Sequence, residues 1–102
     1  METFTIQPVL WLQHKNTDGS CRLKLCVSIR SKRIYVQTPF RIHPDTWDAF
    51  SHRVTGIPNE TLVNQMIRYH ISSVDRVIRE RLAEEKPITA RFLNHQNRGA
   101  TS

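Results

Sequence analysis

The sequence predicts an α+β domain in which a three-stranded antiparallel sheet packs on one long C-terminal helix. Hydrophobic residues recur with a period of two up to about residue 40, and with the period of a helix from about residue 59. A three-stranded sheet with one apolar face needs an element to cover it, and the apolar stripe of the helix supplies that cover. The chain has 102 residues, which is the length of a single domain.

The first strand is expected at about residues 3–12, where apolar residues alternate with more polar ones. Pro8 interrupts this run, which is typical of an edge strand or of a β-bulge. The link to the next strand contains Asp18-Gly19, a dipeptide typical of turns. The positions expected to face the core are Phe4, Ile6, Leu10 and Leu12.

The second and third strands are expected at about residues 21–30 and 33–40. In the second strand the odd positions are apolar and the even positions are mostly polar or basic, and the third strand repeats the pattern with the opposite parity. A two-residue turn at Ser31-Lys32 would pair Ile29 with Ile34 and keep both apolar faces together. Because Ser-Lys is an unfavourable turn dipeptide, a longer turn is the alternative.

A loop is expected at residues 43–58, with Trp47 packed beneath it. The helix is expected at about residues 59–85, where Asn59 can cap its start and Lys86-Pro87 ends it. The residues expected to form its apolar stripe recur at every fourth position and are Leu62, Met66, His70, Val74, Ile78 and Leu82.

We expect residues 1–86 to form the domain, and residues 87–102 to begin a linker or a further helical domain that is truncated. Thr89 is placed to cap that further helix. No segment has the apolar length of a membrane span, and no basic stretch precedes an apolar run at the N-terminus, so neither a membrane segment nor a signal peptide is expected. Cys21 and Cys26 have an odd spacing that puts them on opposite faces of a strand, and two unpaired thiols favour a reducing cytoplasm.

The positive charge of the chain is concentrated in residues 15–41. The whole chain has a net charge of +6, and this stretch alone holds seven basic residues and one acidic residue. A localised positive field attracts polyanions, which include nucleic acids, acidic membrane surfaces and acidic proteins. The alternative is a basic face that only keeps the protein in solution.

The sheet face opposite the helix is expected to stay open and to bind nucleic acid. Basic side chains interleaved with aromatic and amide side chains suit contacts with phosphates and with base edges in the major groove. The alternative is that these charges only prevent aggregation of the sheet. The residues expected to contact DNA are Trp11, Lys15, Arg22, Lys24, Ser28, Arg30, Lys32, Arg33, Tyr35 and Gln37.

No catalytic centre, metal site, cofactor or small-molecule site is expected. The five histidines are scattered and do not have the Cys/His spacing of a zinc site. The three glycines form no phosphate-binding loop, and nothing in the sequence brings Ser, His and Asp residues together.

Several segments, in their order and spacing, resemble the N-terminal arm-type DNA-binding domain of tyrosine recombinases, which are the integrases of phages and conjugative transposons. The likeness extends over about residues 3–93. Compared with that family, the chain has Ser31-Lys32 where Asn-Gly is common, Pro39 where Gly is common, and Trp11 where a basic residue is common. The segments that carry the resemblance are residues 4–10, 16–19, 23–29, 32–38, 46–48 and 53–56.

The resemblance implies sequence-selective binding of double-stranded DNA at arm-type sites, with the sheet in the major groove. It also implies a part in the DNA integration and recombination of a mobile genetic element, together with other recombinase subunits. The catalytic domain of such a recombinase would lie outside this chain, so neither Tyr35 nor Tyr69 is expected to be the nucleophile. Two other functions stay open, a module that binds double-stranded RNA and a protein-interaction module of a recombination complex.

Overall fold

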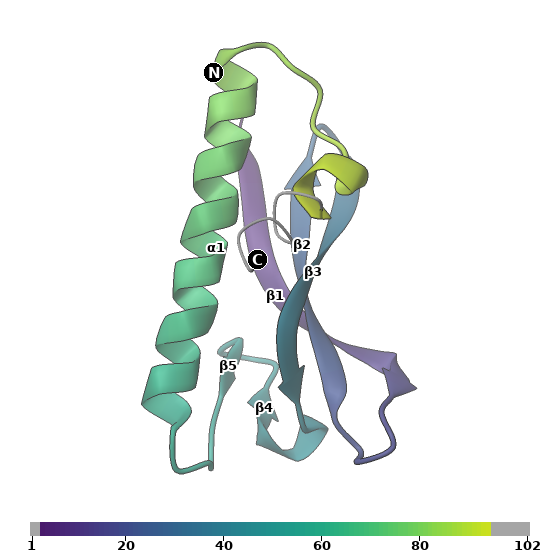
Figure 1. The fold of residues 1–102 in the computed structure, drawn as a ribbon, viewed down its shortest axis with the longest axis vertical. Coiled ribbons are helices and arrows are strands. Elements are labelled where there is room, and N and C mark those ends of the chain that lie inside the picture. The colour runs from purple at the N-terminus through teal and green to yellow at the C-terminus, as the bar shows by residue number, and fades with distance from the viewer. Residues whose placement is uncertain (1–2, 95–102) are drawn as a thin grey trace.

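The computed structural model describes residues 3–94 and confirms the α+β fold (Figure 1). A three-stranded antiparallel sheet has the order β1-β2-β3, and a second, two-stranded sheet pairs β4 with β5. Figure 1 shows the long helix running alongside the larger sheet. The elements are β1 (Phe4–Lys15), β2 (Cys21–Ile29), β3 (Lys32–Ile42), the 3-10 turn η1 (Pro44–Thr46), β4 (Trp47–Asp48), β5 (Arg53–Val54) and α1 (Glu60–Ala83), followed by a short helical segment at residues 90–94.

The core lies between β2, at the centre of the sheet, and α1. Leu25 and Val27 of β2 are completely buried and belong to one cluster with Val74 and Ile78 of α1. Burying a side chain of this size stabilises the fold by roughly 1.5–3 kcal/mol. A second cluster, near the start of α1, contains Leu23, Ile42, Val54 and Ile67, with Trp47 packed against it as predicted.

The turn between β2 and β3 is formed by Arg30 and Ser31, so the predicted turn at Ser31-Lys32 was wrong. Both residues have positive φ, 51° and 64°, as in the type I′ turn whose twist matches that of the flanking strands. Val27 therefore pairs with Ile34. The alternation of apolar residues determines which face each residue occupies, but a shift of two residues leaves the faces unchanged.

Both edge strands are longer than predicted, because each contains an irregularity. In β3, Leu23 of β2 lies opposite the stretch 38–40, where Pro39 has no N–H to donate and the Thr38 hydroxyl donates to the Leu23 carbonyl at 2.6 Å. The strand then continues to Ile42. In β1 the register shifts after Leu10, which leaves Leu12 58% exposed rather than in the core.

The buried face of α1 differs from the predicted stripe. Leu62 and Met66 are 56% and 49% exposed, whereas Ile67 is buried. Residues four apart on an α-helix are displaced by about 40° at each step, so a row of them drifts about half a turn over the length of this helix. Asn64 is also buried, and its side chain bonds both the N–H and the carbonyl of Val54, which joins β5 to the helix. Asn59 precedes the helix but makes no side-chain cap bond.

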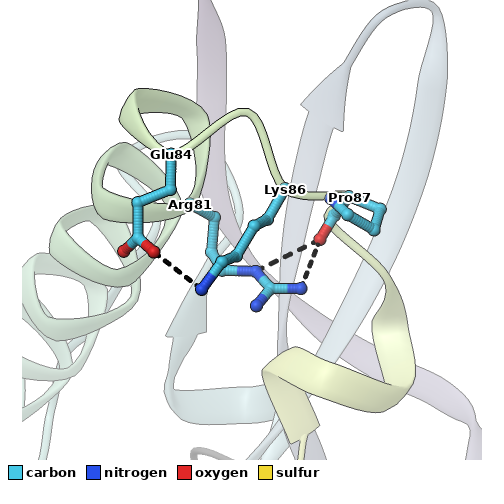
Figure 2. A network of polar contacts seen from close by, with 4 residues as sticks. All are labelled: Arg81, Glu84, Lys86 and Pro87. Atoms are coloured by element: carbon cyan, nitrogen blue, oxygen red, sulfur yellow. Dashed lines mark hydrogen bonds and ion pairs between the residues drawn. The ribbon is translucent and has the colours of Figure 1, made fainter.

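The chain turns back on itself after α1 (Figure 2). The Lys86 N–H donates to the Arg81 carbonyl, and Glu85 takes a φ of 58°, which together form a Schellman-type helix end. The Arg81 guanidinium donates twice to the Pro87 carbonyl, and Lys86 pairs with Glu84 at 2.7 Å. These contacts set the direction in which the chain leaves the helix.

The segment after this turn packs on the sheet. The Thr89 hydroxyl accepts a hydrogen bond from the Phe92 N–H, which confirms the predicted cap. Leu93 is 2% exposed within the first core cluster, and the Asn94 side chain accepts a hydrogen bond from the backbone N–H of Gln37. The core therefore extends to Leu93, beyond residue 86, where we expected the domain to end.

Candidate nucleic-acid interface

The sheet face turned away from α1, called the open face below, carries the residues that alternate with the buried core. On β2 the odd positions from Cys21 to Ile29 are buried, so the even positions point to the other side. The strand register brings Cys26 opposite Gln7 and Tyr35 across the width of the sheet. The residues that the alternation, register and contacts assign to the open face are Thr5, Gln7, Val9 and Trp11 of β1, Arg22, Lys24, Cys26 and Ser28 of β2, and Arg33, Tyr35, Gln37 and Arg41 of β3.

Two aromatic residues and a lysine, one from each strand, lie together near the centre of the open face. These residues, called the aromatic cluster below, are Trp11, Lys24 and Tyr35. The rings of Trp11 and Tyr35 meet edge to face, with their centroids 5.2 Å apart. The Lys24 ammonium lies over the Trp11 ring, 4.0 Å from its centroid. Each ring contact restricts the side chains that make it, so this cluster is ordered without any ligand.

A shallow hollow of about 250 Å³ adjoins this cluster. Its walls are rich in hydrogen-bond donors, because guanidinium, ammonium, amide and imidazole groups converge on it from β1, β2, β3 and the β1–β2 loop. The residues that line the hollow are Trp11, His14, Asn16, Arg22, Lys24 and Gln37.

The loop between β1 and β2 holds Asn16 at this hollow. Asn16 donates from its side chain to the Ser20 hydroxyl at 3.1 Å. Asp18 accepts hydrogen bonds from both the hydroxyl and the backbone N–H of Ser20, and these bonds lower the pKa of the Asp18 carboxyl below its usual value. Gly19 has a φ of 87°, a conformation that L side chains rarely adopt. The Asp18-Gly19 turn predicted from the sequence is thereby confirmed.

The cations of the open face lack carboxylate partners among residues 3–94. Within residues 3–94, Arg79 pairs with Asp75 on α1, whereas Arg22 and Arg41 have no carboxylate within ion-pair distance. Moreover, Arg22 and Arg41 lie directly opposite each other on neighbouring strands. Like charges in such positions are destabilising, and a bound polyanion relieves the repulsion.

The structure brings together most, but not all, of the residues predicted to contact DNA. Trp11, Arg22, Lys24, Tyr35 and Gln37 meet around the aromatic cluster and the hollow.

Two more of the predicted residues lie farther along the open face and three lie away from it. Ser28 and Arg33 face each other as a cross-strand pair on that face. Lys15 and Lys32 are paired with Cys21 and Ile29, whose side chains point to the core, and Arg30 lines a groove near the end of α1. Lys32 was predicted to contact DNA because of its charge. It has the same parity as the core residue Ile34, however, so its position in β3 does not place it on the open face. Whether any of these residues touches DNA stays a prediction.

Sequence reasoning missed Arg41, His14 and Asn16. The signal for Arg41 was present, because it has the parity of Tyr35 and Gln37 and belongs to the basic stretch, but we expected the strand to end before it. No sequence signal marked His14 and Asn16, since they follow the irregularity in β1 that breaks the alternation.

Among residues 3–94, no group of three or more His, Cys, Asp or Glu side chains is placed to hold a metal ion. Cys21 and Cys26 are both unpaired, with Cys21 in the core and Cys26 on the open face. No described helix combines the length and the apolar character that crossing a membrane requires.

Comparison with known protein families gives a match over most of the chain. The model of a family described as "Arm DNA-binding domain" matches residues 10–94, a range that contains β2, β3, α1 and the hollow. Neither the curated proteins nor the solved structures include a significant match.

Proposed function

The chain belongs to the arm DNA-binding domain family, and we propose that it binds double-stranded DNA sequence-selectively through its open face. DNA binding itself follows from the family. The finer proposal is that the sheet enters the major groove of arm-type sites, as β-structures do in other DNA-binding proteins.

One observation carries this proposal. Arg22 and Arg41, from neighbouring strands, meet on the open face without acidic partners among the described residues, beside the amide of Gln37. Unpaired cations suit phosphates, arginine can also bond guanine with two hydrogen bonds, and glutamine can do so with adenine. The arrangement therefore supplies both the groups that hold a duplex and the groups that discriminate its sequence.

The proposal extends to the biological setting. We place this domain in a tyrosine-type site-specific recombinase of a mobile genetic element, where it tethers the enzyme to arm sites during DNA integration and recombination. The catalytic domain and the other recombinase subunits would then act in the same complex, in the cytoplasm. The basis for this is the family alone.

The test is a salt titration of duplex DNA binding, followed by fluorescence anisotropy. Each phosphate contact should steepen the plot of log affinity against log salt by about 0.9. Arg22→Ala should weaken binding and reduce the slope by about 1, whereas Arg76→Ala, an exposed residue on α1, should change neither. A salt-independent affinity, or equal losses from the two variants, would contradict the proposal.

A competition experiment separates DNA from RNA. The A-form major groove of RNA is too deep and narrow for side chains to reach base edges, and its reading groups lie in the shallow minor groove. A DNA duplex should therefore displace the bound probe at a lower concentration than an RNA duplex of the same length and sequence. Stronger competition by the RNA would favour a double-stranded RNA-binding module instead.

A further inference from the structure

We propose that Trp11 and Tyr35 together recognise the C5-methyl group of a thymine in the major groove, so that the preferred site contains a T·A pair at a fixed position. This inference rests on the proposed function, because it requires the open face to enter the major groove. It adds an element of specificity that neither the charge of the face nor the family match assigns.

The first argument is the position and order of the two rings. Trp11 comes from β1 and Tyr35 from β3, yet their centroids are only 5.2 Å apart, so they meet across the central strand. The Lys24 ammonium, 4.0 Å from the centre of the Trp11 ring, further restricts that ring. Tyr35 remains 37% exposed. The pair thus presents an apolar surface that is formed before DNA arrives, with little side-chain entropy left to lose on binding.

The second argument is what a duplex offers to such a surface. The faces of stacked bases are covered by their neighbours, so an aromatic side chain cannot stack on them unless a base leaves the helix. On the major-groove edges the donors and acceptors vary, and the apolar group among them is the C5-methyl of thymine. An apolar, ring-lined surface at the centre of a sheet in this groove therefore fits a thymine methyl.

The third argument is the contrast between the aromatic pair and its surroundings. Arg22 and Gln37 line the hollow beside Trp11 and supply hydrogen-bond groups for neighbouring base pairs. A guanidinium or an amide at the position of Trp11 would favour guanine or adenine there. The carbon surface of an indole held against a phenol ring favours an apolar contact instead.

The experiment removes only the methyl group. The chain is used to select binding sites from a pool of random-sequence DNA duplexes, and each selected duplex is then remade with deoxyuridine in place of single thymines. This replacement keeps the Watson–Crick groups and the charge of the duplex. We expect about a fourfold loss of affinity at one thymine, the loss that corresponds to burying one methyl-sized group.

Variants connect that loss to the two rings. In Trp11→Ala and Tyr35→Ala the thymine and deoxyuridine duplexes should bind equally well, whereas Tyr35→Phe, which keeps the ring, should retain the difference. Arg33→Ala is the matched control on the same face: it should weaken binding to both duplexes and leave their ratio unchanged. Because Trp47 is the second of two tryptophans and packs on the core, its fluorescence in Trp11→Ala reports whether that variant is folded.

The outcomes separate this inference from the proposed function. Selection of a defined site whose deoxyuridine forms all bind as tightly as the thymine form would overturn the inference and leave sequence-selective binding intact. Methyl sensitivity that persists in both alanine variants would place the recognition elsewhere and would also overturn it. Failure to enrich any site would remove the proposed sequence selectivity and this inference with it.

Discussion

The two faces of the larger sheet use the same strands for different ends. On β2, Leu23 and Leu25 have no exposed surface, whereas Arg22 is exposed and Lys24 between them is half-buried. The inner face is mostly apolar, and α1 and the segment around Leu93 shield it from solvent. The open face instead holds opposed arginines and a preformed aromatic pair. A step of one residue along β2 thus separates the contacts that stabilise the fold from those proposed to bind DNA.

The difference teaches that the open face departs from what stability alone favours. Directly opposed like charges, such as Arg22 and Arg41, weaken a sheet, and they persist where function requires them. Substitutions on the inner face should therefore lower the free energy of unfolding, and substitutions on the open face should lower the affinity for DNA.

The largest effect is expected from Leu25→Ala on the inner face. It would lower the free energy of unfolding by about 3 kcal/mol, because it leaves a cavity between the sheet and the helix. Urea denaturation measures the loss. Ser28→Ala on the open face is the control and should stay within about 0.5 kcal/mol of the native chain. Similar losses from both variants would break the distinction between the faces.

The next effect concerns the link between the helix and the small sheet. Asn64→Ala removes both hydrogen bonds to Val54 and leaves a buried N–H and a buried carbonyl without partners. The free energy of unfolding should fall by about 2 kcal/mol in the same denaturation experiment. DNA affinity per folded molecule should not change, and a specific loss of affinity would extend the interface to the helix side. Gln65→Ala, at an exposed neighbouring position, serves as the control.

Arg41→Gln sharpens the comparison most, because its two expected effects differ in kind. DNA affinity should fall about tenfold, equivalent to about 1.4 kcal/mol, since one cation facing the duplex is lost. The free energy of unfolding should stay unchanged or rise by up to about 0.5 kcal/mol, since the repulsion with Arg22 is relieved. Anisotropy and urea denaturation measure the two quantities. A variant that loses stability and keeps its affinity would assign Arg41 to the fold instead.

The smallest effect is expected at the end of α1. Glu85 has a φ of 58°, and Glu85→Gly should raise the free energy of unfolding by about 1 kcal/mol, because glycine adopts this conformation without strain. Ala83→Gly, inside the last turn, should instead lower it by about the same amount. Thermal unfolding of the two variants shows the signs directly, and a shift in the same direction for both would contradict the assigned helix end.

The sequence predicted which residues lie on each face of the sheet better than it predicted the strand register and the position of the turn. Alternation identified Leu25 and Val36 as inward-facing, but it could not distinguish registers that differ by two residues, so the turn was misplaced. Lys32 was included in the candidate site because it is basic, without regard to the alternation along β3. Its cross-strand partner Ile29 faces the core. The irregularity at Pro39, which places Arg41 opposite Arg22, includes a side-chain bond from Thr38 that no periodic pattern encodes.

The helix and the end of the chain show a similar limit. A spacing of four residues predicted the helix but placed Leu62 on its buried side, because that spacing drifts around the axis. The cap at Thr89 was visible in the sequence. The packing of Leu93 depends on the turn made through Arg81 and Pro87, which only the three-dimensional structure reveals. Whether residues 87–102 begin another domain stays a prediction.

The central claim, that the open face binds duplex DNA, is tested most directly by a chemical-shift map of the labelled chain titrated with a DNA duplex selected by the same chain. The account predicts the largest changes at Trp11, Arg22, Lys24 and Tyr35, with Arg76 on the outer surface of α1 unaffected. Changes centred on α1, with the open face unperturbed, would contradict it.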